Sequence, residues 1–220
     1  EIILTADGVL TWTNKEREKA GLPVLLPSAK LSASALAKVR DMFDKQYFAH
    51  ESPTGKGAGD LAEKEGYEFI VIGENLALGN FGDDKGLVKA WMESPGHRAN
   101  ILNSKYTEIG VAVMKGTFED RTTWLAVQHF GTPLSFCPAI NTALKTHITS
   151  SETRLNQLNA ALAEKKTELD SFQPKNSPEY NTKIDEYNEL VHEYNALLAE
   201  LKNSIETYNA EVRAFNACAA

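Results

Sequence analysis

Three side chains in the first half of the sequence have the types that carry out chemistry in proteins: His50, Glu74 and His97. Neutral imidazole nitrogens and a carboxylate oxygen suit a borderline divalent ion such as zinc. The same groups act as general bases and acids when they are held within reach of a substrate. Each has a structural alternative, because a histidine can brace a loop and a carboxylate can accept backbone N–H groups. The remaining histidines are interpreted as solvated or packing residues: His129, His147 and His192.

Two serines, Ser52 and Ser94, are the candidate nucleophiles, and neither lies in the Gly-x-Ser-x-Gly pattern of a nucleophile elbow. The two cysteines, Cys137 and Cys218, lie outside any CxxC spacing, which weakens zinc-ribbon and redox interpretations. Hydrolysis by a metal-activated water requires an open coordination position. No catalytic residue is assigned from these residue types alone.

The segments that position these residues mix helix-like and strand-like patterns separated by turn signals. Leu36, Val39, Met42 and Phe43 recur at three- and four-residue steps, which predicts the apolar face of a helix. Glu74 follows a short apolar strand and is predicted to lie in a Gly-Glu-Asn turn. Helices before and after a hairpin-bearing sheet favour an α+β domain over a doubly wound one. We expect helices at 14–21, 32–47, 58–66 and from 87 to 92, strands at 69–72, 109–114 and 124–130, and a turn at 118–121.

The pattern changes near Cys137. No glycine follows Gly131, and the later residues read as helical, so we expect two domains, 1–136 and 137–220. Pro174 and Pro178 interrupt the helical pattern, with Ser177 placed to cap the second helix. Apolar residues of the second helix alternate in steps of three and four, as in a coiled coil. This seam contains Tyr180, Ile184, Tyr187, Val191, Tyr194, Leu198, Leu201, Ile205, Tyr208, Val212 and Phe215, and a weaker one contains Ile148, Ser151, Leu155, Leu158, Leu162, Lys165, Leu169 and Phe172.

Two such helices joined by a short turn predict an antiparallel coiled-coil hairpin. Cys137 and Cys218 lie almost equally far along the chain from Asn176, so we expect them side by side at the open end, joined by a disulfide. Two unrelated free thiols are the alternative. A bridge would support export, because disulfides persist mainly in oxidising compartments. A seam this regular also permits self-association, since it can pair between chains.

Composition excludes several classes of function. The net charge is −7 and no basic run exists, so the electrostatic footprint of a nucleic-acid binder is absent. No apolar run approaches the ~18–20 residues of a membrane-spanning helix. The sequence opens at Glu1 without an apolar export segment, and we expect such a signal to have been removed or left out.

The order and spacing of several motifs over about residues 9–133 resemble the CAP superfamily of cysteine-rich secretory, antigen 5 and pathogenesis-related proteins, most closely its bacterial secreted branch. The resemblance implies an α-β-α sandwich, export, and a shallow cleft with histidines and carboxylates. It does not reach residues 137–220. The motifs are Asn14-x-x-Arg17-x-x-x-Gly21-Leu22, Phe48-x-His50-x-Ser52-Pro53, Gly73-Glu74-Asn75-Leu76-Ala77, Trp91-x-x-Ser94-Pro95-Gly96-His97-Arg98-Ala99-Asn100-Ile101-Leu102, Ile109-Gly110-Val111 and Gln128-His129-Phe130-Gly131.

The eukaryotic form of this family has a cluster of two histidines and two glutamates. His50 and Glu74 match one of each. The second glutamate position is occupied by Ser94, with Glu93 one residue early, and the second histidine position by Leu125. The resemblance therefore implies that this sequence has one histidine and one glutamate of that cluster and lacks the other two residues.

His97 is the residue that can compensate for the missing half. It lies one turn after Glu93, so an (i, i+4) contact forms if the helix continues. Pro95 and Gly96 between them can instead end the helix, which would remove the pairing. His50, Glu74, His97, Glu93 and Ser94 are thus the expected cleft residues, with His50 and His97 as the expected ligands of a divalent metal such as zinc.

The resemblance favours a secreted, extracellular, periplasmic or cell-surface binding module that is not an enzyme. Its partner would be an unidentified protein or a small hydrophobic ligand, with lipid, small-ligand or divalent-metal binding in the cleft and the coiled coil as a docking or spacer arm. The alternative is a metal-assisted, peptidase-like hydrolase that uses His50, His97 and Glu74.

Overall fold

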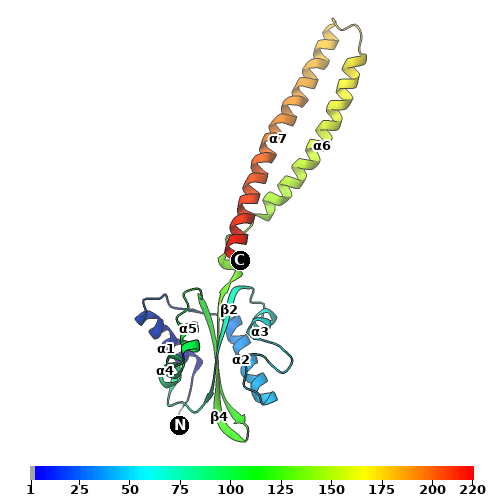
Figure 1. Ribbon diagram of the computed structural model, residues 1–220. Coiled ribbons are helices and arrows are strands. Elements are labelled where there is room, and N and C mark those ends of the chain that lie inside the picture. Colours follow the sequence, from blue (N-terminus) through cyan, green and yellow to red (C-terminus); the bar gives the residue numbers. More distant parts are fainter. Residues whose placement is uncertain (1–2) are drawn as a thin grey trace. The chain divides into compact units, whose positions relative to one another are not determined.

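A computed structural model describes residues 3–220, and the chain forms two compact units, Glu1–Phe136 and Cys137–Ala220. The first unit, coloured from blue to green in Figure 1, contains a mixed sheet with the strand order β1-β3-β4-β2. β1 pairs with β3 in parallel, whereas β4 pairs with both β3 and β2 in antiparallel fashion. The strands are β1 (Leu26–Pro27), β2 (Phe69–Gly79), β3 (Glu108–Phe118) and β4 (Arg121–Pro133).

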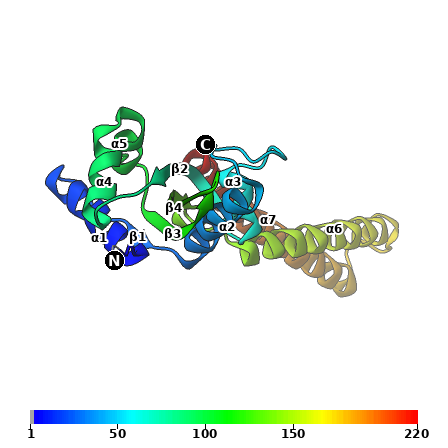
Figure 2. The same cartoon turned by 90° about the horizontal axis from the view of Figure 1, so that it is seen from below.

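Five helices cover the two faces of this sheet. Helices α1, α4 and α5 lie on one side, and α2 and α3 lie on the other (Figure 2). The unit is therefore layered helix, sheet, helix, and the α+β prediction is confirmed. The helices are α1 (Ala6–Lys19), α2 (Ala29–Lys45), α3 (Ala58–Lys64), α4 (Asp84–Glu93) and α5 (Pro95–Ile101).

Helix α2 packs on the sheet through the predicted apolar face. Ala35, Val39 and Met42 are fully buried against residues of the central strands, while Leu36 and Phe43 pack at the edge of the same cluster. Full burial of a side chain of the size of valine or methionine stabilises a fold by about 1.5–3 kcal/mol. Helix α2 is consequently fixed on the sheet.

Gly110 on β3 permits this close packing. A Cβ atom at this position would lie 2.0 Å from the carbonyl carbon of Leu31 and 2.1 Å from the backbone nitrogen of Ser32. Both atoms belong to the backbone of the first turn of α2, so a side chain could be accommodated only by moving the helix. The absence of a side chain at Gly110 thus sets the distance between α2 and the sheet.

Strand β2 is longer than the predicted strand at 69–72 and continues through Glu74 to Gly79. The prediction of a turn at Glu74 was wrong, because this segment pairs with β4 along its length. Its outer edge is covered by side chains: Trp91 Nε1 donates to the Leu76 carbonyl at 3.0 Å, and Asn100 Nδ2 to the Glu74 carbonyl at 2.9 Å. These bonds satisfy carbonyls that an edge strand would otherwise expose.

The structure also corrects other predicted boundaries. The turn between β3 and β4 is confirmed, and its residues Glu119 and Asp120 have positive φ angles of 46° and 63°. Helix α1 begins at Ala6, well before residue 14, because Thr5 caps it by accepting a hydrogen bond from the Gly8 N–H at 3.0 Å.

The second unit contains two helices, α6 (Thr142–Ser171) and α7 (Pro178–Ala219). They run antiparallel, as ion pairs between Arg154 and Glu193 at 2.7 Å and between Lys165 and Glu186 demonstrate. Ser177 caps α7 as predicted, because its hydroxyl accepts from the Tyr180 N–H at 3.1 Å.

The predicted disulfide between Cys137 and Cys218 is confirmed, with the two Cα atoms 5.6 Å apart. Leu155, Leu158 and Leu201 are buried where the two helices pack. Whether this packing is a coiled coil in the strict sense stays a prediction. Across residues 3–220, no helix combines the length and the apolar character that crossing a bilayer requires.

Candidate functional site

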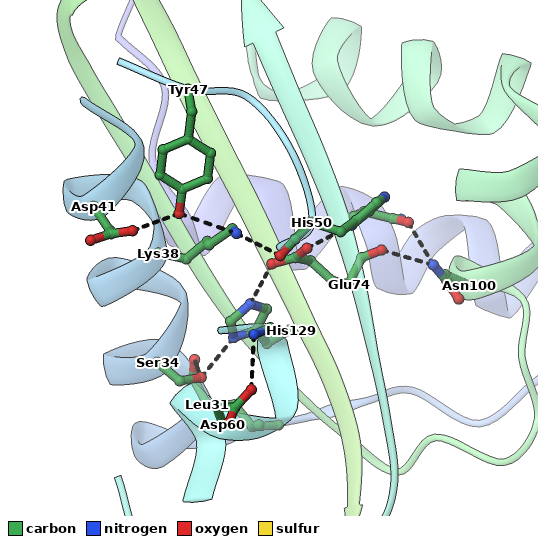
Figure 3. A network of polar contacts seen from close by, with 12 residues as sticks. Leu31, Ser34, Lys38, Asp41, Tyr47, His50, Asp60, Glu74, Asn100 and His129 are labelled. Carbon is green, nitrogen blue, oxygen red and sulfur yellow. Dashed lines mark hydrogen bonds and ion pairs between the residues drawn. The ribbon is translucent and has the colours of Figure 1, made fainter. Parts of the chain in front are cut away.

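The carboxylate of Glu74 joins two histidines (Figure 3). Nδ1 of His50 lies 2.6 Å from Oε1, and Nε2 of His129 lies 2.9 Å from Oε2. The side chain of Glu74 is 5% exposed and that of His129 is 0% exposed, whereas that of His50 is 67% exposed. One buried acid therefore links a fully buried imidazole to a solvent-facing one.

The strand register explains the inner half of this contact. Glu74 on β2 and His129 on β4 are directly paired residues of neighbouring antiparallel strands, which places their side chains on the same face of the sheet. A buried carboxylate is costly unless its oxygens are hydrogen-bonded. Here each oxygen lies within hydrogen-bond distance of an imidazole nitrogen, which offsets the cost of burying the carboxylate.

Helix α2 supplies the far partner of His129. Its residue Ser34 is fully buried, with Oγ 2.7 Å from Nδ1 of His129, and its hydroxyl also lies 2.9 Å from the Leu31 carbonyl. The close approach of α2 at Gly110 makes this contact possible, because Gly110 is the β3 residue paired with His129. Both ring nitrogens of His129 thus have a partner.

A second chain of contacts holds the loop that carries His50. Lys38 on α2 is fully buried, and its ammonium donates to the His50 carbonyl at 2.6 Å. It also contacts the Tyr47 hydroxyl at 3.4 Å, and that hydroxyl donates to Asp41 Oδ2 at 2.6 Å (Figure 3). The backbone at His50 is therefore fixed from α2, as its ring is fixed from β2.

Burial is the largest influence on the pKa values of Lys38 and Tyr47 in this second set of contacts. It lowers the pKa of the Lys38 ammonium, against the opposing effect of Glu74, Asp41 and Glu51. Burial also raises the pKa of the Tyr47 hydroxyl, and the hydrogen bond to Asp41 raises this pKa further. The tyrosine therefore stays neutral at ordinary pH and acts as a hydrogen-bond bridge.

His97 approaches the site from α5. Its backbone carbonyl accepts from Asn75 Nδ2 at 3.1 Å, next to Glu74. Burial lowers the pKa of the half-buried His97 ring, and the charge of His50 lowers it further. His97 thus lies close enough to His50 for their charges to interact, but its described contact with the site is made by the backbone.

Glu93 and Ser94 lie at a break between two helices. Helix α4 ends at Glu93 and α5 begins at Pro95. The (i, i+4) contact between Glu93 and His97 was expected only if one helix continued through both residues, and this condition is not met. Glu93 instead pairs with Lys89 at 3.7 Å and lines a different groove, between α1 and α4. Neither residue extends the His50–Glu74 contact.

A groove of about 400 Å³ lies beside the loop that carries His50. Ser52 lines this groove, and its hydroxyl accepts from the backbone N–H groups of Lys56 at 3.0 Å and Thr54 at 3.3 Å. Ser52 is thereby engaged in bracing its own loop rather than activated as a nucleophile. The lining residues are Ala37, Asp41, Lys45, Tyr47, Ser52, Thr54, Lys56, Asp60, Leu61 and Lys64.

The residues of the site do not fit a metal centre with three protein ligands. Among residues 3–220, no group of three or more His, Cys, Asp or Glu side chains is arranged to hold a metal ion. The reason is visible in the contacts, because Nδ1 of His50 and Nε2 of His129 point at Glu74 and occupy both of its oxygens. In this arrangement the carboxylate of Glu74 orients the imidazole of His50.

His129 is the site residue that the sequence analysis missed, because a histidine on a strand was interpreted there as an ordinary solvated or packing residue. A signal was present: Gln128 and His129 are consecutive polar residues inside the otherwise apolar strand at 124–130. Both are fully buried, and polar groups at such positions require specific partners. Gln128 finds its partners in Asn75 at 3.1 Å and Thr13 at 2.7 Å.

Comparisons with known proteins agree with these motifs. Residues 10–130 match the profile of the cysteine-rich secretory protein family, CAP. The chain is 45% identical over 116 residues to "Uncharacterized protein YkwD" of Bacillus subtilis, a match that covers 53% of this chain and 43% of that protein. It is 36% identical over 105 residues to "Uncharacterized membrane protein YlbC" of the same species, covering 48% and 30%. The matched region spans less than half the length of either relative.

Two solved structures similar to this chain each cover 57% of it. An outer surface protein from Borrelia burgdorferi superposes with a TM-score of 0.50 at 22% identity, covering 57% of this chain and 90% of that one. An extracellular protein containing a SCP domain from Bacillus anthracis superposes with a TM-score of 0.49 at 30% identity, covering 57% and 39%.

Proposed function

Because the chain belongs to the cysteine-rich secretory protein (CAP) family, we propose that it is an exported binding module whose ligand is recognised at His50. The disulfide between Cys137 and Cys218 supports export, since such bonds persist mainly in oxidising compartments. The activity and partners of its relatives are not carried over, because the match covers only part of each relative.

The observation that carries the proposal is the contrast in exposure between His50 and Glu74. An exposed histidine needs no buried partner for the stability of the fold, yet here a carboxylate that is 5% exposed holds the ring at 2.6 Å. A carboxylate accepts the Nδ1–H of the ring, so the Nε2 atom is left for another partner. Binding gains affinity when a recognition group is already fixed in its bound orientation.

The groove lined by Ser52 and Thr54, which belong to the same loop as His50, indicates which class of ligand fits. Hydroxyl, carboxylate and ammonium groups contribute to its lining, including those of Tyr47, Ser52 and Lys56, beside apolar surface to which Ala37 and Leu61 contribute. The Nε2 atom of a neutral His50 accepts a hydrogen bond from a hydroxyl group. We therefore propose a polyhydroxylated ligand, a saccharide segment, and the small hydrophobic ligand that the sequence suggested is the alternative outcome of the test.

A hydrolase is the second candidate, and the same contact favours it. A carboxylate on Nδ1 fixes the tautomer whose Nε2 can take a proton from water or a substrate hydroxyl. The metal-free form of this candidate needs only His50 and Glu74, whose Nδ1 and Oε1 atoms lie 2.6 Å apart. Binding of a saccharide without its cleavage separates the module from the hydrolase.

The proposal is tested by titrating the isotopically labelled full chain with chitotriose and, separately, with laurate as a lipid probe. We expect chitotriose to shift the amide signals of His50, Ser52 and Lys56, and the shifts to be lost in His50→Ala. The matched control is His147→Ala, on α6, which should keep them. Response to laurate alone, or chitotriose shifts that survive in His50→Ala, would overturn the proposal.

The second unit is proposed to act as a docking or spacer arm that also permits self-association. Its support is the long pair of antiparallel helices and the covalent closure at Cys137 and Cys218. Sedimentation velocity of the full chain over a hundredfold range of concentration tests the self-association. A single concentration-independent species would contradict it.

A further inference from the structure

The geometry points to His129 as a positioning residue for the proposed site: it holds Glu74 in the one orientation that fixes the ring of His50. This inference rests on the proposed role of His50. It concerns the free protein, however, and does not depend on which ligand binds.

Glu74 has two carboxylate oxygens, and each has a different neighbour. His129 binds Oε2 at 2.9 Å, and His50 binds Oε1 at 2.6 Å. Rotation of the carboxylate about its last bond would break both contacts. A partner that fixes Oε2 therefore also directs Oε1 at His50.

His129 is itself held in place by its surroundings. It is fully buried in the central strand β4 and paired with Glu74 across the ladder. The other ring nitrogen of His129, Nδ1, lies 2.7 Å from Oγ of Ser34 on α2. Helix α2 can approach this closely because the β3 residue paired with His129 is Gly110, which has no side chain. The pairing of β4 with β2 fixes the backbone of His129, and the hydrogen bond with Ser34 on α2 fixes its ring.

The other residues around Glu74 do not replace His129 in this function. Asn100 binds the backbone carbonyl of Glu74 at 2.9 Å rather than its carboxylate. Lys38 binds the carbonyl of His50 at 2.6 Å. These contacts place the two residues, whereas the orientation of the carboxylate depends on His129.

The test is the tautomer of His50, read at pH 8 from long-range nitrogen–proton correlations of the labelled full chain. In the wild type we expect the ring proton on Nδ1. In His129→Leu, we expect the Nε2–H form to become the main one, because the released carboxylate turns away. His129→Gln should restore the Nδ1–H form, since its amide nitrogen replaces Nε2 as the donor to Oε2. The matched control, His147→Leu, should not change the tautomer.

An unchanged tautomer in a folded His129→Leu would overturn the inference, as would a failure of His129→Gln to restore it. Should the leucine variant not fold, Ser34→Ala replaces it, with an expected rise of at least twofold in the Nε2–H fraction of His50, and no rise contradicts the inference. No ligand enters this experiment. Absence of saccharide binding would therefore remove the proposed function and leave the positioning role of His129 intact.

Discussion

Glu74 and His129 face each other directly across β2 and β4, with Oε2 of the acid 2.9 Å from Nε2 of the imidazole. The other oxygen of Glu74 reaches His50, whose side chain is mostly in solvent. A single strand register thus connects the buried centre of the sheet with a group on the surface.

Replacing Glu74 by Gln is expected to destabilise the protein. The amide has one acceptor in place of two, so one of the two imidazoles loses its partner, and an unsatisfied buried group costs about 1–3 kcal/mol. Urea denaturation measures the change in the free energy of unfolding. Glu93→Gln is the matched control and should stay within about 0.5 kcal/mol of the wild type, because Glu93 is exposed. Equal stability of the two variants would contradict the structure.

His97 predicts a specific dependence of stability on pH. Burial and His50 lower the pKa of His97 below its ordinary value of 6.5 in the folded state. Below pH 6.5 the unfolded chain therefore binds this proton more readily than the folded chain, and stability falls as the pH falls. Thermal unfolding between pH 5 and 7.5 should show a flatter profile for His97→Gln than for the wild type. Parallel profiles would show that His97 does not contribute to this slope.

Gly110→Ala is expected to cost about 3 kcal/mol or more, because its Cβ would overlap the backbone of Leu31 and Ser32. Gly96→Ala is the matched control, since a Cβ there meets nothing within 4 Å and the residue lies in α5. The control should be neutral or slightly stabilising, because alanine favours a helix over glycine. Chemical denaturation measures both, and a tolerated Gly110→Ala would disprove the close packing of α2.

The disulfide predicts resistance to labelling. Under denaturing, non-reducing conditions, Cys137 and Cys218 should both stay unalkylated, and reduction should expose two thiols per chain. The bridge joins residues 81 positions apart, and the chain-entropy treatment gives about 4 kcal/mol of stabilisation for a loop of this length. Melting of the Cys137→Ser, Cys218→Ser double variant, followed by the helical circular-dichroism signal, should therefore begin at a lower temperature than melting of the wild type. Alkylation of the denatured, non-reduced wild type would refute the bridge.

Local pattern was sufficient to predict many of the elements. The three- and four-residue spacing of Val39 and Met42 predicts the buried face of α2, because helical periodicity is a property of neighbouring residues. The proline interruption and the position of Asn176 lead to the correct disulfide for the same reason, since the length of a helix follows from its residue count.

The site is predicted only in part because its contacts join distant strands. Sequence reasoning names both His50 and Glu74, but it places Glu74 in a turn, where its partners would be local backbone groups. The actual partner His129 lies 55 residues away and is brought to Glu74 by the register of β2 on β4. No spacing rule in one sequence specifies that register, because it depends on how all four strands pack against the helices.

The most direct test of this account is the tautomer of His50 in the wild-type chain itself. Nitrogen–proton correlations at pH 8 should show the ring proton on Nδ1, held by the carboxylate of Glu74, and the Glu74→Gln variant should lose that preference. A wild-type His50 with its proton mainly on Nε2 would mean that the ring is not held by Glu74 in solution, and the site proposed around it would not exist.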